Sequence, residues 1–156
     1  ILTPIERTLT VQLQKAVDVW TALGCRVLKM APEQHDAAFA AVSHLPHLIA
    51  FAMINGISGQ PQGKDYLSLA GPGFRDFTRI AASDPTMWRD VFLSNKEAVL
   101  EMLQRFSEDL AAMQRAIRWD DGDALFDHFT RTRAIRRSIV EQGQDDSRPD
   151  FGRSHV

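Results

Sequence analysis

The sequence predicts a mainly α-helical protein, in which a helical bundle follows a short strand-helix-strand unit. Apolar residues recur at alternating steps of three and four over several long segments, which is typical of amphipathic helices. Proline and glycine clusters break the chain between these segments. Only the first 30 residues contain the alternation that indicates strands.

Composition narrows the possible classes of protein. The chain has 156 residues, enough for one main core, and its contents of 44% hydrophobic and 24% charged residues are those of an ordinary soluble globular protein. A net charge of −2 gives no general attraction to nucleic acid or membrane, so we expect neither as a partner. The purely apolar run at 48–54 is far shorter than the roughly 20 residues of a spanning helix. A single cysteine, Cys25, excludes an internal disulfide and fits a cytoplasmic location.

Residues 1–30 form the strand-helix-strand unit. Ile1 to Thr3 is an apolar stub, a helix follows Pro4 and is closed by Gly24, and Cys25 to Met30 alternates as a strand. Such a crossover normally belongs to a parallel sheet. Because two parallel strands cannot bury both faces of a sheet, we expect further strands from an N-terminal neighbour that the sequence does not contain.

Residues 31–142 are expected to be helical. Pro32 suits the first turn of a helix, and Ser43 is a plausible N-cap for a new helix whose first turn tolerates Pro46. The segment 45–57 is apolar nearly all round, which places its helix in the middle of a bundle. Glycines and Pro61 make a loop at 56–63.

The second half of the chain has clear helix starts. Asp84-Pro85 has the N-cap then N1 order, and Asn95 begins a longer helix in a similar way. That helix has a narrow apolar seam of the coiled-coil kind, along which we expect a partner helix. The seam consists of Val99, Leu103, Phe106, Leu110, Met113 and Ile117. Asp121-Gly122 is the turn into a last helix, and the composition of residues 143–156 predicts a flexible tail.

Two arginines are the first candidates for binding a ligand. Arg75 and Arg79 are one helical turn apart after Gly71-Pro72-Gly73, and two planar guanidinium forks suit a carboxylate. The alternative is that both are solvated or paired with nearby carboxylates. Those carboxylates are Asp76, Asp84 and Asp90.

Histidines and a tryptophan form a second group of candidates. His44 and His47 are three residues apart and follow His35-Asp36, so a metal site has to be considered. A metal-dependent phosphohydrolase of the HD type needs an earlier histidine, which is absent, so no metal is expected. A histidine in an apolar helix is more often hydrogen-bonded in the core or in contact with a ligand. Trp88 either lines a pocket or is a half-buried core residue.

Two blocks together resemble a known family. Ser43-His44-Leu45-Pro46-His47 and the segment 73–90 are similar to the C-terminal half of prephenate and arogenate (cyclohexadienyl) dehydrogenases, enzymes of tyrosine biosynthesis. The resemblance extends from Ile1 to about Arg137. It implies that residues 1–30 end a Rossmann-type dinucleotide-binding domain, and that residues 31–142 form a helical domain for dimerisation and substrate binding. The expected partner is therefore a second copy of the chain.

The resemblance also implies a reaction and roles for individual residues. The family decarboxylates prephenate oxidatively to 4-hydroxyphenylpyruvate with NAD or NADP. Arg79 is implied to hold a substrate carboxylate, with Arg75 as a basic neighbour, and His47 to face the substrate side chain. Trp88 is implied to belong to the same substrate site. His35, Asp36 and Asp76 are candidates for residues behind the site that orient its basic groups.

The resemblance also implies which parts of the family enzyme this chain lacks. In the family, the histidine that takes the hydroxyl proton and the glycine-rich cofactor loop belong to the N-terminal part. No catalytic residue is therefore named here, NAD or NADP is expected to bind mainly to the absent domain, and the chain alone is expected to be inactive. The sequence leaves open prephenate against arogenate and NAD against NADP.

Two readings from other classes of protein also remain open. The apolar seam on its own fits a non-catalytic helical dimerisation module. A local basic cluster in the last helix fits a nucleic-acid-binding regulator, although acidic residues nearby argue against it. The cluster consists of Arg131, Arg133, Arg136 and Arg137, and the acidic residues are Asp120, Asp121, Asp123 and Asp127.

Overall fold

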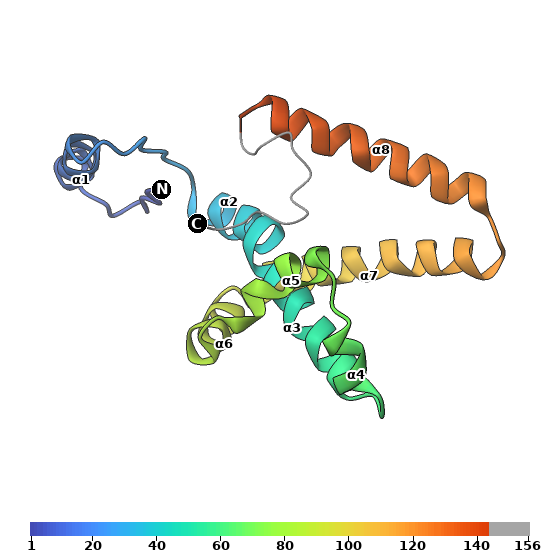
Figure 1. The fold of residues 1–156 in the computed structure, drawn as a ribbon. Helices are drawn as coiled ribbons and strands as arrows, with labels where there is room; N and C mark the ends of the chain where they lie inside the picture. Colours follow the sequence, from blue (N-terminus) through green and yellow to red (C-terminus); the bar gives the residue numbers. More distant parts are fainter. Residues whose placement is uncertain (144–156) are drawn as a thin grey trace. The chain divides into compact units, whose positions relative to one another are not determined.

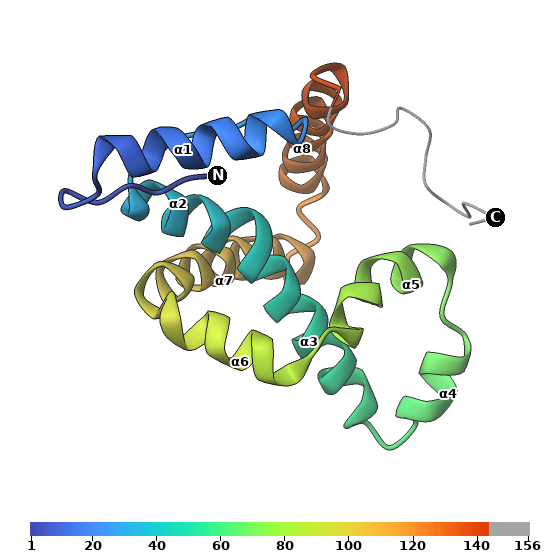
Figure 2. The same ribbon diagram turned by 90° about the vertical axis from the view of Figure 1, so that its left-hand side faces the viewer.

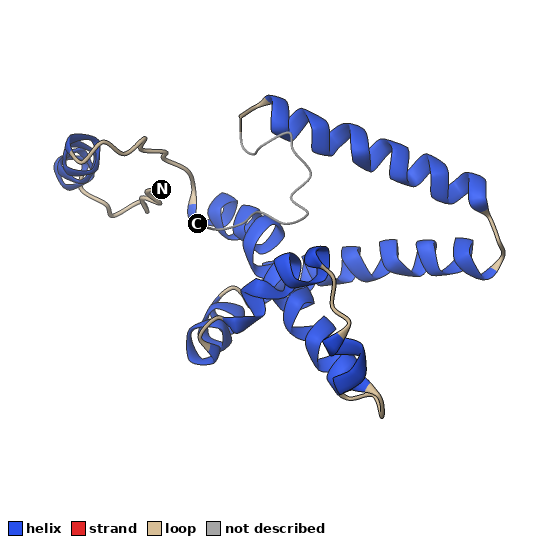
Figure 3. Ribbon diagram, in the orientation of Figure 1, coloured by secondary structure: helices blue, strands red, loops and turns tan. Residues whose placement is uncertain are grey.

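The computed structural model describes residues 1–143, and these are almost entirely helical (Figure 1). Figure 3 shows only helices and loops in this part of the chain. The prediction of a mainly α-helical protein is confirmed. In order, the elements are α1 (Thr10–Ala22), α2 (Pro32–Phe39), the π-helical turn η1 (Ala40–His44), α3 (Leu45–Ser58), α4 (Gly63–Ser68), α5 (Pro72–Thr78), the 3-10 turn η2 (Arg79–Ala82), α6 (Pro85–Ser94), α7 (Lys96–Arg118) and α8 (Gly122–Glu141).

The chain divides into two compact units. The first comprises residues 1–48 and 84–102, and the second comprises residues 49–83 and the chain from residue 103 onward. The first unit therefore holds α1, α2, η1 and α6 with the beginnings of α3 and α7, as Figure 2 allows the reader to follow. The second holds α4, α5, η2 and α8 with the remainders of α3 and α7.

The prediction of two regular strands within residues 1–30 is wrong. Within residues 1–143 the segments 1–3 and 25–30 pair only through an isolated parallel bridge between Leu2 and Lys29. The Leu2 amide donates to the Leu28 carbonyl at 2.8 Å, and the Met30 amide donates to the Leu2 carbonyl at 3.2 Å. The parallel direction is as expected, and the helix between the segments does end at Gly24, with φ of 82°. Two short parallel segments without further strands are marginal, because too little apolar surface is buried to stabilise a longer ladder.

Ser43 is not the N-cap that the sequence predicted. The helix continues from Pro32 to Ser58 through η1, where the Leu45 amide donates to the Ala40 carbonyl, five residues earlier. A π-turn of this kind accommodates one extra residue without ending a helix. Pro46 follows directly, because the wider turn relaxes the contact that proline normally makes with the preceding carbonyls.

The helix 32–58 contains an 18-residue window with a mean hydropathy of 1.7, so by length and composition alone it could cross a membrane. Core helices of soluble proteins pass the same test. Only three of its residues are fully buried within the chain: Ala40, Leu45 and Ala50. Much of its apolar surface therefore remains uncovered by the described residues.

The second unit contains the end of α7 and all of α8, and the two helices diverge from the turn that joins them (Figure 1). Asp121 caps α8, since its Oδ1 accepts from the Ala124 amide at 3.0 Å, which confirms the predicted turn. The seam of α7 is buried at its start, where Val99 is 5% exposed, and becomes open toward its end, where Ile117 is 64% exposed. Apart from Gly143, the predicted tail at 143–156 lies outside the described residues.

Candidate functional site

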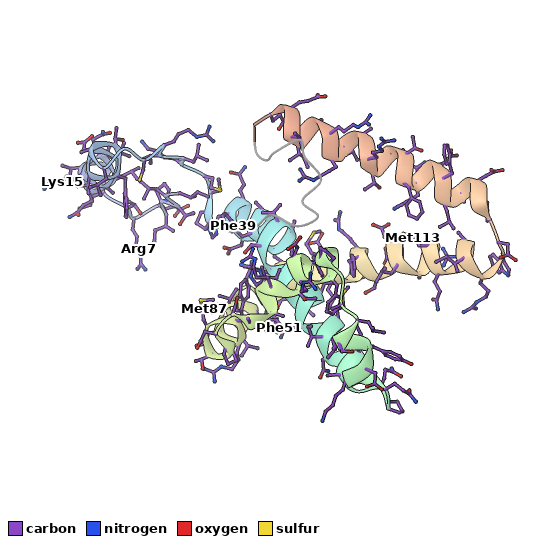
Figure 4. The ribbon with its side chains drawn as sticks, in the orientation of Figure 1. Arg7, Lys15, Phe39, Phe51, Met87 and Met113 are labelled. Atoms are coloured by element: carbon purple, nitrogen blue, oxygen red, sulfur yellow. The ribbon has the colours of Figure 1, made fainter. Side chains whose placement is uncertain are left out.

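A cluster of aromatic rings joins α3 to α6 in the first unit. The imidazole of His47 stacks on the indole of Trp88, with ring centroids 3.7 Å apart and planes 23° apart. Phe92, one turn along α6, lies tilted against the indole, with ring centroids 5.4 Å apart. Trp88 is only 7% exposed. Figure 4 labels Met87, its neighbour on α6.

The start of α6 fixes the position of Trp88. Asp84 accepts a hydrogen bond from the Met87 amide through Oδ1 at 2.7 Å, and Pro85 occupies the first helical position. The predicted order of N-cap and proline is confirmed. Because Trp88 is in the first turn after this cap, the cap determines where the indole meets α3.

A hydrogen bond to the helix backbone fixes the imidazole of His47. Its Nδ1 lies 2.8 Å from the carbonyl oxygen of Ser43, one turn earlier. A carbonyl only accepts, so Nδ1 carries the hydrogen and Nε2 is left as the acceptor. Ser43 therefore contributes its carbonyl to the site instead of capping a helix.

Asn95 joins α2, η1 and the start of α7. Its side-chain amide donates to the carbonyl of Asp36 at 2.8 Å and lies 3.2 Å from Nδ1 of His44. The position before α7 was predicted, but the side chain reaches these two groups instead of capping the helix. The His44 ring also meets the Trp88 indole edge to face, with centroids 6.0 Å apart. His44 and Asn95 are thus contact residues that the sequence could not place, because 51 positions separate them.

Burial lowers the pKa of His44 from its ordinary value of 6.5. The nearby His35 lowers this pKa further, the Asp36 carboxylate opposes the change, and His47 adds a smaller lowering effect. Loss of hydration disfavours the imidazolium, and two other histidines add like charge when they are protonated. The lowered pKa of His44 therefore favours its neutral form in the folded protein.

His35 and Asp36 lie at one side of this cluster, on α2. Nδ1 of His35 is 2.9 Å from the Asp36 carboxylate, and the His35 ring stacks on Phe39 at 4.5 Å. Phe39 is labelled in Figure 4. The orienting role expected of His35 and Asp36 stays a prediction, although the Asp36 carbonyl accepts from Asn95 and the Asp36 charge raises the pKa of His44 against the other effects.

The indole nitrogen of Trp88 is buried without a partner. Among residues 1–143, Nε1 is the one buried side-chain nitrogen or oxygen atom that lacks a hydrogen bond. A buried donor in this state costs on the order of 1–3 kcal/mol relative to a bonded one.

The two candidate arginines lie in the second unit. Arg75, on α5, donates from Nη1 to the Ala70 carbonyl at 2.7 Å. Arg79 begins η2 directly after α5 and is exposed. Within residues 1–143 it makes no ion pair or side-chain hydrogen bond, and neither does the exposed Asp76.

Pairing of these arginines with nearby carboxylates is not observed among residues 1–143. Asp90 is bonded to Arg89 at 2.7 Å, and Asp84 caps α6. The guanidinium of Arg79 thus keeps its full set of donors for another group. Arg79, Arg75 and Asp76 belong to the second unit and His47 and Trp88 to the first, and the roles of all five at a shared site remain predictions.

Residues 1–143 contain neither a cluster of metal-binding side chains nor the glycine-rich turn typical of a dinucleotide site. Residues 1–143 contain no group of three or more histidine, cysteine or acidic side chains that could hold a metal ion. A dinucleotide site needs a glycine-rich turn between a strand and a helix. Here the glycines at 71 and 73 flank the start of α5, and the sheet is reduced to one bridge. The residues present therefore do not fit a nicotinamide cofactor.

Comparison with known proteins decides the family. Residues 31–131 match the model for the prephenate dehydrogenase dimerization domain. The chain belongs to this family. It is 37% identical over 141 residues to the cyclohexadienyl dehydrogenase of Zymomonas mobilis, which covers 89% of this chain and 48% of that protein.

Solved structures agree with the assignment to the prephenate dehydrogenase family. Prephenate dehydrogenase from Aquifex aeolicus, in complex with hydroxyphenyl propionate and NAD+, superposes with a TM-score of 0.81 at 38% identity, covering 88% of this chain and 48% of that one. Arogenate dehydrogenase from Synechocystis gives a TM-score of 0.77 at 29% identity, covering 88% and 50%. The chain thus spans about half the length of these relatives. The predicted resemblance is confirmed.

Proposed function

We propose that the complete protein is an NAD(P)-dependent prephenate or arogenate dehydrogenase, and that this chain supplies its substrate-binding and dimer-forming helical part. The observation that carries the proposal is the match to dehydrogenases of these names over 88–89% of the chain. The reaction is the oxidative decarboxylation of prephenate to 4-hydroxyphenylpyruvate, or the matching reaction of arogenate. We propose a cytoplasmic protein whose partners include neither nucleic acid nor membrane.

Arg79 is the proposed contact for a substrate carboxylate. It is exposed and unpaired within residues 1–143, so its donors are not used by the protein itself. Arg75 adds positive charge one turn earlier, although its Nη1 already bonds the Ala70 carbonyl. Two such groups favour an anion in the same place.

His47 and Trp88 are the proposed contacts for the rest of the substrate. Their stacked rings leave Nε2 of His47 without a protein partner among residues 1–143. The partly exposed His47 imidazole, backed by the buried indole of Trp88, presents a flat ring with a nitrogen acceptor, which suits a ring compound with a polar side chain. We assign no catalytic residue to this chain, and the chain alone is expected to be inactive.

Dimerisation through α7 and α8 is the second part of the proposal. Large apolar side chains on both helices and in the turn between them are exposed, including Ile117 on α7, Trp119 in the turn, and Phe126 and Phe129 on α8. Exposed apolar surface of this kind marks an interface. The same feature fits a helical module without a substrate site, so the test must act on Arg79 and not on the dimer.

The cofactor belongs to another part of the complete protein. The family relatives are about twice as long as this chain, and the residues described here do not fit a dinucleotide. When bound, the nicotinamide accepts the hydride that leaves the substrate ring.

The Arg79→Ala variant of the complete gene product tests the proposal. Loss of a charge-assisted contact costs about 2–4 kcal/mol, or roughly 30-fold to 900-fold in kcat/KM for prephenate or arogenate. The matched control is Arg89→Ala, which removes an exposed arginine paired with Asp90 and is expected to change kcat/KM by less than about fivefold. Unchanged kcat/KM in Arg79→Ala would remove the proposed substrate contact and favour the dimerisation module.

A further inference from the structure

We infer that Asn95 is a positioning residue: it holds His44 in the tautomer opposite to that of His47, so that the pair offers a ligand one hydrogen-bond donor and one acceptor. The comparisons above assign no role to either Asn95 or His44. The use of this pair by a substrate rests on the proposed function, but the tautomers themselves do not.

The tautomer of His47 follows from its partner. Nδ1 lies 2.8 Å from the Ser43 carbonyl, which has no hydrogen to give. Neutral His47 therefore carries its hydrogen on Nδ1, and Nε2 presents a lone pair.

The tautomer of His44 follows from Asn95, which presents a hydrogen-bond donor where Ser43 presents an acceptor to His47. The side-chain nitrogen of Asn95 bonds the Asp36 carbonyl at 2.8 Å, which identifies it as the donor end of the amide. The same nitrogen lies 3.2 Å from Nδ1 of His44, so Nδ1 must accept. Neutral His44 then carries its hydrogen on Nε2, where it presents a donor.

Both Nε2 atoms remain available. Neither has a hydrogen-bond partner within residues 1–143. Neither is fully buried, because within these residues Trp88 Nε1 is the one buried side-chain nitrogen or oxygen without a partner. His44 and His47 are both partly exposed, are three residues apart, and contact the same indole. Two histidines in the same tautomer would offer two donors or two acceptors instead.

Burial and the surrounding groups together favour the neutral form of His44. The groups that act on it are His35 and Asp36 from α2 and His47 from α3, while Asn95 and Trp88 from the other side carry no charge. Burial is the largest effect and keeps the pKa of His44 below its usual value. Protonation of Nδ1 would place a donor against the Asn95 donor, so acid breaks this contact.

The Asn95→Asp variant tests the inference. A carboxylate only accepts, so it should turn His44 to the tautomer with the hydrogen on Nδ1 and raise its pKa above that of the wild type. Carbon and nitrogen chemical shifts of isotope-labelled histidine in the complete gene product report the tautomer of each ring, and His44→Gln assigns the signal. Asn55→Asp is the matched control, since Asn55 is an exposed asparagine on α3.

The expected result is opposite tautomers for His44 and His47 in the wild type, a change at His44 in Asn95→Asp, and no change in Asn55→Asp. Binding of hydroxyphenyl propionate in the presence of NAD+ should weaken about tenfold in Asn95→Asp only. Equal tautomers in the wild type, or no change at His44 in Asn95→Asp, would overturn the inference. A changed tautomer with unaltered binding would overturn the positioning role. Failure of the proposed function is seen separately, as unaltered kcat/KM in Arg79→Ala.

Discussion

Replacement of Trp88 by phenylalanine should leave stability nearly unchanged, although this indole is among the most buried side chains of the chain. The indole is 7% exposed and stacks on His47, and a phenyl ring preserves that stack. The change also removes Nε1, a buried donor without a partner within residues 1–143. The two effects oppose each other.

The magnitudes can be compared directly. Removal of an unpaired buried donor returns on the order of 1–3 kcal/mol. The smaller ring leaves a void and loses packing, which costs about 1–2 kcal/mol by the usual scale for core truncation. We therefore expect Trp88→Phe to change the unfolding free energy by less than about 1 kcal/mol, whereas Trp88→Ala loses the stack and should cost about 3–5 kcal/mol.

Urea unfolding followed by far-ultraviolet circular dichroism measures both variants without relying on tryptophan fluorescence. Trp119→Phe is the control, because Trp119 is 71% exposed and its replacement should matter by less than about 0.5 kcal/mol. If Trp88→Phe costs nearly as much as Trp88→Ala, Nε1 has an acceptor in the folded protein and the reasoning is refuted.

Three further predictions concern stability. Gly63→Ala should lower the free energy of unfolding by about 1–3 kcal/mol, because the new Cβ would clash with the Ile57 carbonyl and lie 2.9 Å from the Ser58 carbonyl. Gly56→Ala, in open space within α3, should raise it by about 0.5–1 kcal/mol. Equal effects of the two variants in urea unfolding would contradict this prediction. Asp84→Ala should lower the melting temperature, because it removes about 1 kcal/mol contributed by the α6 cap. Asp90→Ala should shift the melting temperature little, because Asp90 is exposed. A larger shift in Asp90→Ala than in Asp84→Ala would contradict the prediction. Because folding lowers the pKa of His44, the unfolded chain binds more protons below pH 6.5, and stability falls as the pH is lowered from there to the folded pKa. His44→Gln should weaken this pH dependence, as measured by urea unfolding at several pH values. An identical pH dependence in the variant would contradict the assignment of the effect to His44.

Local signals predicted the elements of this fold well. Asp84-Pro85, Asp121 and Gly24 mark helix ends where the structure has them, because capping depends on a few neighbouring residues. The π-turn at 40–44 was missed, since it preserves the apolar pattern on both sides and leaves no sequence signal of its own. The strands were overestimated, because alternation shows a segment's preference and not whether it has a neighbour to bond.

The candidate site was predicted less completely. Sequence motifs selected His47 and Trp88, which the structure brings into contact. Asn95 was expected as a helix cap, and its bond to His44 depends on how α2 and α7 meet, 51 residues apart. A contact of this kind follows from packing, which no local pattern reports. Arg79 was selected by its spacing and by the family resemblance, and its unpaired state among residues 1–143 could not be read from the sequence.

The most direct test of the proposed activity is the absorbance at 340 nm of the complete gene product mixed with NAD or NADP and with prephenate or arogenate in turn. The account predicts formation of the reduced cofactor with at least one of the four pairs, together with the decarboxylated aromatic product. No reduced cofactor with any pair, from a protein shown to be folded, would contradict the assignment of this activity.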